Sequence, residues 1–178
     1  MGLLCSGVVR ADAGLKKIPE MSLITARGQK IQIAKYAKSQ GKKNLLMVFF
    51  RTGSCGVCVQ QLEEFSERIG DIHDANTALL AVSMDDAIIQ ARTSDKIKKA
   101  YPILMDTEGK AAKAFGVFNP AEKLAYPSIF LFDSEGKILY EHRGKSIQDR
   151  PTLQTVLQAV RHYSGQLPKR ISAEGDIR

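Results

Sequence analysis

Two cysteines three residues apart are the residues in this sequence best suited to chemistry. Cys55 and Cys58 form a Cys-x-x-Cys that follows an apolar run, residues 45–50, and a short turn, residues 51–54. This pattern predicts a buried strand, a tight turn and a helix whose first turn carries both thiols. A thiolate at a helix N-terminus faces unpaired backbone N–H groups and the positive end of the helix dipole, which lowers its pKa. The spacing therefore predicts a redox-active pair, with Cys55 as the nucleophile and Cys58 as its resolving partner.

Other uses of two nearby cysteines are a structural disulfide, a pair of buried thiols or half of a zinc site. A zinc site needs two further ligands at motif spacing, and the chain offers only Cys5 and three scattered histidines, His73, His142 and His162. A Cys-x-x-Cys at a strand-to-helix turn in a βαβ pattern favours redox chemistry instead. We therefore expect no metal site and no cofactor.

The elements that must position the pair are predicted from hydrophobic periodicity and turn residues. Strands are expected at 18–23, 29–33, 45–50, 78–84, 103–105, 128–132 and 137–143. Helices are expected at 34–40, from Cys55 to about 70–76, at 86–100 with Ile88, Ile89, Ile97 and Ala100 toward the core, at 110–115, and at 148–163 with Pro151 in the first turn. Strands alternating with helices and closing on a hairpin imply a mixed sheet covered by helices on both faces.

Five short motifs also occur along the chain in a fixed order: IPEMSL at 18–23, the Cys-x-x-Cys, AVSMD at 81–85, AFGV at 114–117 and YPSIFLFD at 126–133. Together they resemble the thioredoxin superfamily, in particular its alkyl hydroperoxide reductase/thiol-specific antioxidant (AhpC/TSA) and TlpA-like branch, from residue 18 to about residue 144. The resemblance implies an α/β thioredoxin-like fold with a central mixed β-sheet flanked by helices and an N-terminal β-hairpin extension. It does not select one activity.

The resemblance also implies substrate-binding residues. Tyr126-Pro127 matches a segment whose proline is cis and faces the cysteines, and whose preceding residue holds a substrate peptide as an extra strand; a strand-start proline is the alternative. Thr52 lies three residues before Cys55, as in the Thr-x-x-Cys of peroxiredoxins, where the hydroxyl positions the peroxide. The proline of that longer motif falls at Val48, so the match is partial. We favour a helix cap as the role of Thr52.

Three positions depart from the resembled branch. Ser54 stands in place of the family's usual tryptophan, Gln61 in place of the glutamate that often moves protons in TlpA-like disulfide reductases, and Phe49 in place of the acid that other thioredoxins bury in the central strand. Gln61 can hydrogen-bond but cannot accept a proton at ordinary pH. We therefore expect Cys58 to resolve a mixed disulfide slowly near neutral pH, and expect Gln61→Glu to accelerate that step.

These residues lead to one interpretation and two alternatives. We interpret the protein as a thiol–disulfide oxidoreductase that acts on a disulfide-containing protein or a small thiol substrate, is recycled by an electron-donor reductase, and serves antioxidant defence and cell redox homeostasis. The first alternative is a peroxiredoxin-like thiol peroxidase that reduces hydroperoxides at Cys55. The second is a non-enzymatic copper-binding or interaction domain, because copper chaperones of the superfamily pair two cysteines with a distant histidine, here His142.

Composition and charge restrict the domain organisation and the partners. The 178 residues fit one thioredoxin-like domain, predicted at 18–165, between an N-terminal tail or truncated signal segment at 1–17 and a polar C-terminal tail at 166–178. The net charge is +7, but the lysines are scattered and no basic run is interleaved with aromatic residues, so we expect no nucleic acid partner. No apolar run reaches the length of a membrane span.

The first residues carry an ambiguous targeting signal. Residues 2–9 are apolar, and the small-x-small sequence at 11–13 has the form of a signal-peptidase site, although no basic residue precedes the apolar part. A truncated signal segment would favour a periplasmic or otherwise extracytoplasmic location. A plain N-terminal tail, which leaves a cytoplasmic location open, is the alternative. Cys5 is expected to take no part in the redox chemistry.

Overall fold

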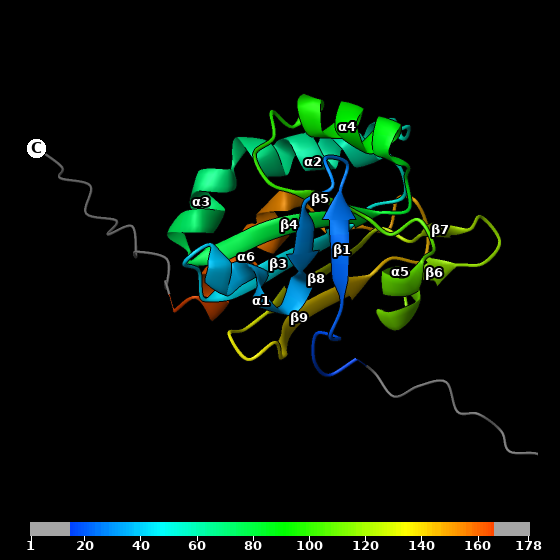
Figure 1. Ribbon diagram of the computed structural model, residues 1–178. Helices are drawn as coiled ribbons and strands as arrows, with labels where there is room; N and C mark the ends of the chain where they lie inside the picture. The colour runs from blue at the N-terminus through cyan, green and yellow to red at the C-terminus, as the bar shows by residue number, and fades with distance from the viewer. Residues whose placement is uncertain (1–14, 166–178) are drawn as a thin grey trace, which may run out of the picture.

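The computed structural model describes residues 15–165, which fold around one seven-stranded sheet (Figure 1). Its strands are β1 (Ser22–Thr25), β2 (Lys30–Gln32), β3 (Asn44–Phe49), β4 (Thr77–Ser83), β5 (Ile103–Met105), β8 (Ser128–Phe132) and β9 (Ile138–Arg143); β6 (Phe118–Asn119) and β7 (Leu124–Ala125) form a separate ribbon. The helices are α1 (Ile33–Ser39), α2 (Gly56–Glu67), α3 (Ile69–Asp74), α4 (Ala87–Lys96), α5 (Lys110–Ala114) and α6 (Leu153–Tyr163). Cys5, most of the candidate signal segment and the tail at 166–178 lie outside the described residues.

The sheet is mixed, as the sequence predicts. The strand order is β2-β1-β5-β4-β3-β8-β9. β3, β4 and β5 are parallel, whereas β8 pairs antiparallel with β3 and β9 antiparallel with β8. The N-terminal hairpin of β1 and β2 extends the sheet on the other side, where β1 pairs antiparallel with β5. The predicted thioredoxin-like fold with its hairpin extension is confirmed.

Both faces of the sheet are covered, which explains why β3 reads as an unbroken apolar run. Leu45, Met47 and Phe49 point to the face covered by α1 and α5. Leu46 and Val48 point to the opposite face, covered by α2, α3, α6 and the C-terminal end of α4. Figure 1 shows α2 and α4 on one side of the sheet and α1 and α5 on the other. All six residues of β3 are buried.

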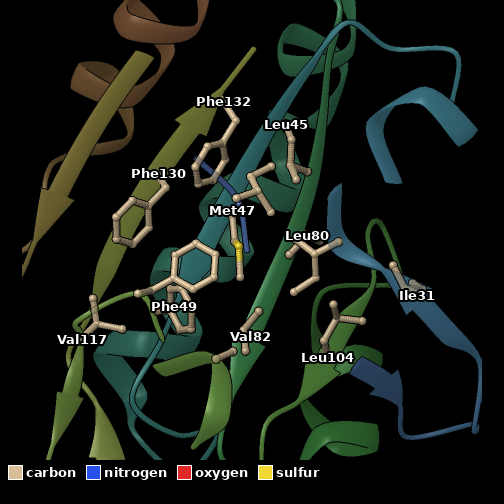
Figure 2. Packing of buried hydrophobic residues seen from close by; sticks show 14 of the residues in the cluster. Ile31, Leu45, Met47, Phe49, Leu80, Val82, Leu104, Val117, Phe130 and Phe132 are labelled. Carbon is tan, nitrogen blue, oxygen red and sulfur yellow. The ribbon is translucent and has the colours of Figure 1, made fainter. Parts of the chain in front are cut away.

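Phe49 belongs to the core rather than to the site. Its ring centroid lies 5.1 Å from that of Phe115 and 6.0 Å from that of Phe130. Figure 2 shows Phe49, Phe130 and Phe132 on the same side of the sheet as Met47. Aromatic side chains therefore pack at the position where other thioredoxins bury an acid. A charged group at this position would be buried among them without a partner.

The sequence prediction and the structure differ locally at several places. The first strand, expected at 18–23, is β1 at Ser22–Thr25, and the helix expected at 86–100 ends at Lys96. The motif helix is divided at Arg68 into α2 and α3, and the ribbon of β6 and β7 was not expected. The last helix begins at Leu153, because the hydroxyl of Thr152 caps it and Pro151 lies just before the cap. Ile88 is 64% exposed, because the buried side of α4 is made by Gln90 and Thr93 instead.

The topology brings the chemically interesting segments to one edge of the sheet. β3 and β4 are parallel, so residues 50–55 and 84–86 follow their carboxyl ends side by side. β8 is antiparallel to β3, with Ser128 opposite Phe49, so the Tyr126-Pro127 segment enters the sheet at the same edge. Ser128 also pairs with Arg143 at the end of β9, which places the loop at 144–152 there too. None of the helices between residues 15 and 165 is long and apolar enough to cross a membrane.

Candidate active site

Cys55 stands at the start of α2. It is the residue before the first helical turn, with extended φ and ψ of −93° and 112°, and its backbone carbonyl accepts the first helical hydrogen bond from Val59. Its thiol is partly exposed and reduced. The predicted placement of Cys55 at the N-terminus of the motif helix is confirmed, and the orphan N–H groups of the first turn therefore face its sulfur.

Cys58 lies three residues, or nearly one helical turn, further along α2 and is fully buried. Burial raises the pKa of Cys55, but the thiol of Cys58, the backbone N–H groups of Cys58 and Val57 and the charge of Arg150 together outweigh it, so its pKa is lowered. Burial is also the main reason why the pKa of Cys58 is raised, and its hydrogen bond to Cys55 raises it further. Cys55 is thus the thiol that ionises first, with Cys58 donating to its sulfur.

A buried carboxylate holds the turn between β3 and α2. Asp85, 6% exposed, follows β4 and accepts hydrogen bonds from the Thr52 hydroxyl at 2.6 Å, the Gly53 N–H at 2.9 Å and the Ser83 hydroxyl at 2.8 Å. The oxygen of Thr52 in turn accepts the N–H of Ser54 at 3.2 Å. Three charge-assisted bonds on one carboxylate fix the position of this turn.

The helix cap predicted for Thr52 is wrong. Cys55, not Thr52, occupies the capping position, and the Thr52 oxygen reaches the N–H of Ser54, which precedes the helix. The reason is the hydrogen bond that the Thr52 hydroxyl donates to Asp85, which directs this hydroxyl toward the end of β4 and away from the first helical turn. The hydrogen of the Thr52 hydroxyl is committed to a carboxylate, so its oxygen can only accept further hydrogen bonds.

Gly53 allows the turn to lie against α4. A Cβ placed on Gly53 would overlap Oγ1 of Thr93 and would lie 3.0 Å from a methyl group of Ile89. Thr93 cannot swing aside easily, because its side chain is buried and its hydroxyl donates to the carbonyl of Ile89 at 2.9 Å. The glycine is therefore required by close packing and not by an unusual backbone angle.

Arg150 is brought to Cys58 from a distant part of the chain. Its Nη2 lies 3.7 Å from the sulfur of Cys58, and its Nη1 donates to the carbonyl of Val57 at 3.3 Å and to Oε1 of Gln61 at 3.4 Å. The guanidinium is held from the other side by the carbonyl of Ile147, which accepts from Nε at 3.0 Å and also from Nη2. A permanent positive charge therefore lies against the buried thiol.

Gln61 faces the site, as the resemblance implies. It is 6% exposed, and its amide donates to the carbonyl of Pro151 at 3.3 Å while its oxygen accepts from Arg150. It therefore ties α2 to the segment that carries Arg150. A second arginine, Arg51, forms an ion pair with Glu122 at 2.9 Å. The hydrogen bond to Glu122 raises the pKa of Arg51, and the two thiolates add smaller contributions.

The Tyr126-Pro127 segment lies at the same edge, but its proline is not cis. No cis peptide bond occurs between residues 15 and 165, so that prediction is wrong. Pro127 instead stands directly before β8, which is the strand-start position given as the alternative. The N–H of Tyr126 donates to the carbonyl of Val117 at 2.8 Å, and the carbonyl of Pro127 accepts from the N–H of Gly144 at 3.0 Å. These bonds hold the segment between neighbouring strands, so its backbone groups are already engaged.

The histidines are not gathered at the cysteines. His142, on β9, instead places Nε2 2.9 Å from Oδ1 of Asp149. Across the part of the chain that the structure describes, no three His, Cys, Asp or Glu side chains lie together as a metal site requires.

Asp85, Asp149 and Arg150 were missed by sequence reasoning. Asp85 had a usable signal, because it follows a strand parallel to β3 and such strands deliver their carboxyl ends to one edge. Arg150 had no such signal. It is separated from Cys58 by 92 positions, and nothing in the sequence distinguishes it from the other scattered basic residues.

Comparisons with known proteins agree with this architecture. The sequence model of the AhpC/TSA family matches residues 15–141. The chloroplastic 2-Cys peroxiredoxin BAS1 of Hordeum vulgare is 27% identical over 158 residues, which cover 82% of this chain and 74% of that protein. Alkyl hydroperoxide reductase E of Mycobacterium tuberculosis is 27% identical over 118 residues, covering 65% of this chain and 77% of that protein.

Solved structures show the same fold. The crystal structure of Enterococcus faecalis AhpC superposes with a TM-score of 0.71 at 21% identity, covering 85% of this chain and 95% of that one. The peroxidoxin BcpB of Mycobacterium tuberculosis gives a TM-score of 0.71 at 18% identity, covering 82% and 94%. At these identities the likeness establishes the thioredoxin-like fold.

Proposed function

Because the chain belongs to the AhpC/TSA family, we propose that it is a thiol peroxidase that reduces hydroperoxides at Cys55 and restores the thiol through Cys58. The observation that carries the proposal is the Cys55 thiol, partly exposed, with a lowered pKa, at the open end of α2. This reverses the order of the two enzymatic interpretations of the sequence, since the curated relatives are named as peroxiredoxins and hydroperoxide reductases.

The reaction has two steps on this chain. The Cys55 thiolate attacks the terminal oxygen of a hydroperoxide; the O–O bond breaks, an alcohol or water leaves after taking a proton, and Cys55 becomes a sulfenic acid. The Cys58 thiolate then attacks the Cys55 sulfur, the S–O bond breaks, and the hydroxide takes a proton from solvent and leaves as water. Because both sulfurs stand in one helical turn, the product is a Cys55–Cys58 disulfide formed without moving a distant segment.

Thr52 is the proposed contact for the peroxide. Its hydrogen is committed to Asp85 and one of its two acceptor positions to the N–H of Ser54, so one acceptor position remains for the O–H of an incoming hydroperoxide. Tyr126 and Pro127 are proposed to border the place where the substrate binds. Their engaged backbone groups favour a small substrate, because pairing with a peptide strand would require Tyr126 to give up its bond to Val117.

Reducing equivalents must come from outside the pair. A relative from Drosophila melanogaster, 29% identical over 126 residues, is named thioredoxin-dependent peroxide reductase. We accordingly propose that a thioredoxin-type dithiol attacks the Cys55–Cys58 disulfide, takes over the disulfide bond and releases both thiols.

A thiol–disulfide oxidoreductase is the second candidate. It is favoured by one observation, the Cys58 thiol three residues after Cys55 on the same helix, which suits exchange with a disulfide as well as resolution of a sulfenic acid. Both reactions begin with the Cys55 thiolate, and they differ in the bond that it attacks.

Parallel reactions of the fully reduced protein distinguish the candidates. One portion receives a stoichiometric amount of an alkyl hydroperoxide and another receives insulin disulfides, each with a Cys55→Ser control. Thiol titration, alcohol analysis and peptide mass spectrometry follow the products. We expect one alcohol and one Cys55–Cys58 disulfide per chain with the peroxide, no reaction in Cys55→Ser, and much slower reduction of insulin. Fast insulin reduction with no peroxide consumption would replace this proposal by the second candidate, and tight copper(I) binding with neither reaction would replace both.

A further inference from the structure

We infer that His142 and Asp149 are positioning residues that hold Arg150 on the sulfur of Cys58, so that the resolving thiol ionises within its buried surroundings. The inference rests on the proposed function only in calling Cys58 the resolving thiol. The contacts themselves are independent of the substrate.

Arg150 approaches Cys58 from a loop and not from a helix or a strand. Residues 144–152, here called the Arg150 loop, connect β9 to α6, and most of them are partly or fully exposed. A guanidinium on such a loop has no fixed position unless the loop itself is tied down. Within the loop the carbonyl of Ile147 accepts from Nε and Nη2, which orients the side chain relative to its own loop but not relative to α2.

Gln61 ties Pro151, the residue after Arg150, to α2. The pair of His142 and Asp149 ties the residue before Arg150 to the sheet. His142 belongs to β9 and pairs with Ile129 of β8, so the sheet fixes the backbone position from which its ring extends. Its Nε2 lies 2.9 Å from Oδ1 of Asp149 and 3.3 Å from the backbone carbonyl of Asp149. An Nε2–H donor therefore reaches two acceptors on the residue that immediately precedes Arg150.

The other carboxylate oxygen of Asp149 closes the loop on itself. Oδ2 accepts from the N–H of Lys145 at 2.8 Å, and the N–H of Asp149 donates to the hydroxyl of Ser146 at 3.2 Å. Gly144 lets the loop leave the sheet tightly, since a Cβ there would overlap the carbonyl oxygens of Pro127 and Asp149. Asp149 thus joins β9 and the first residues of the loop in one hydrogen-bonded unit immediately before Arg150.

The positive charge of Arg150 opposes the effect of burial on the ionisation of Cys58. Cys58 is fully buried, which penalises its thiolate, and the charged or titratable groups that act on it are Cys55 on the same helix, Arg51 before the helix and Arg150. Of the two cations, Arg51 is paired with Glu122, whereas Arg150 directs Nη2 at the sulfur. A donor that hydrogen-bonds the charged form of a group favours that form, so removing Arg150 or displacing it raises the pKa of Cys58.

The test follows the ionisation of Cys58 alone, in the Cys5→Ser/Cys55→Ser chain, in which Cys58 is the remaining thiol. Ultraviolet absorbance of the thiolate and the rate of alkylation are measured against pH. Arg150→Met should raise the pKa of Cys58 and slow alkylation at neutral pH by about tenfold. His142→Ala should change both in the same direction by a smaller factor.

Two matched variants separate positioning from general damage. His142→Gln keeps an N–H donor near the place of Nε2 and should restore most of the alkylation rate, whereas His73→Ala removes a histidine from α3 and should change nothing. His142 is partly exposed, so its variants are expected to fold, and circular dichroism verifies this for each one.

The inference is overturned if Cys58 titrates identically with and without the guanidinium, or if His142→Ala behaves like His73→Ala. It is also overturned if His142→Gln is as impaired as His142→Ala. Because no peroxide is used, this result is independent of whether the protein reduces hydroperoxides. A chain that fails the peroxide assay but shows the predicted titrations would keep the inference and lose the proposed function.

Discussion

The Cys55 side and the Cys58 side of the site are each held by a charged residue, and the two residues differ in the sign of their charge and in their burial. On the Cys55 side, Asp85 is buried behind the turn and accepts bonds from Thr52 and Gly53, without a bond to either sulfur. On the Cys58 side, Arg150 comes from an exposed loop and touches the sulfur itself. The carboxylate therefore determines where the turn lies, and the guanidinium determines the charge that the thiol can carry. Changes near Asp85 should cost stability, and changes near Arg150 should cost reactivity.

The largest loss of stability is expected from Gly53→Ala. The new methyl group would overlap the hydroxyl oxygen of Thr93, and overpacking of this kind costs about 2 to 3 kcal/mol. Gly56→Ala is the matched control, since nothing lies within 4 Å of a Cβ there and alanine favours the helix. Denaturant unfolding measures both. Equal stabilities of the two variants would mean that the turn is not packed on α4.

A smaller loss is expected from Asp85→Asn. The amide matches the carboxylate in shape but places a donor against the donors of Gly53 or Ser83, at a cost of about 1 to 2 kcal/mol in unfolding free energy. The neighbouring Asp86→Asn should be neutral, because Asp86 caps α4 through one oxygen and asparagine caps equally well. If the two substitutions have the same effect in urea unfolding, the carboxylate of Asp85 is not what holds the turn.

Arg150→Met should have the smallest effect on stability of the three site substitutions. Arg150 is only partly buried, and removing it should change the unfolding free energy by less than about 1 kcal/mol. Thermal and urea unfolding test this beside the Cys58 titrations. If Arg150→Met lowers the unfolding free energy as much as Asp85→Asn does, then Arg150 also holds the fold, and its role is not limited to the charge of Cys58.

The pH dependence of the two thiols sharpens the same distinction. The pKa of Cys55 is lowered and that of Cys58 is raised, so the Cys55 thiolate forms below the pH at which a free thiol ionises, about 8.5, and the Cys58 thiolate above it. Alkylation rates in Cys58→Ser and Cys55→Ser chains that also carry Cys5→Ser should therefore level off at lower pH for Cys55. The reverse order would contradict the assignment of nucleophile and resolving thiol.

The features that the sequence predicted are those that depend on local pattern. The apolar run of β3, the turn and the helix opening at Cys55 follow from residues adjacent in the chain, and so do the strands at 103–105 and 128–132, which match the structure. Local pattern does not place Pro151, because proline suits both the first turn of a helix and the residue before a cap. Only the Thr152 hydroxyl, which accepts the N–H of Thr155, decides between the two.

The features that the sequence could not predict are contacts between distant segments. The role of Thr52 depends on Asp85, 33 residues away, and the surroundings of Cys58 depend on Arg150. Gln61 shows the consequence. Sequence reasoning expected Gln61→Glu to supply a base, but the structure places Arg150 against that oxygen. A glutamate there would pair with Arg150 and compete with the Cys58 thiolate for its charge, so the two effects oppose each other.

The most direct test of the account is the rate at which Cys55 reacts with a hydroperoxide. Stopped-flow mixing of the reduced Cys5→Ser chain with an alkyl hydroperoxide at neutral pH should show oxidation of Cys55 at least about a hundredfold faster than that of free cysteine. Cys58→Ser keeps a donor beside Cys55, so it should react at a similar first rate and stop at the sulfenic acid. Thr52→Val should lose most of the acceleration. Oxidation no faster than that of free cysteine would contradict the account. The lowered pKa of Cys55 and the acceptor oxygen of Thr52 would then have no effect on the reduction of a hydroperoxide.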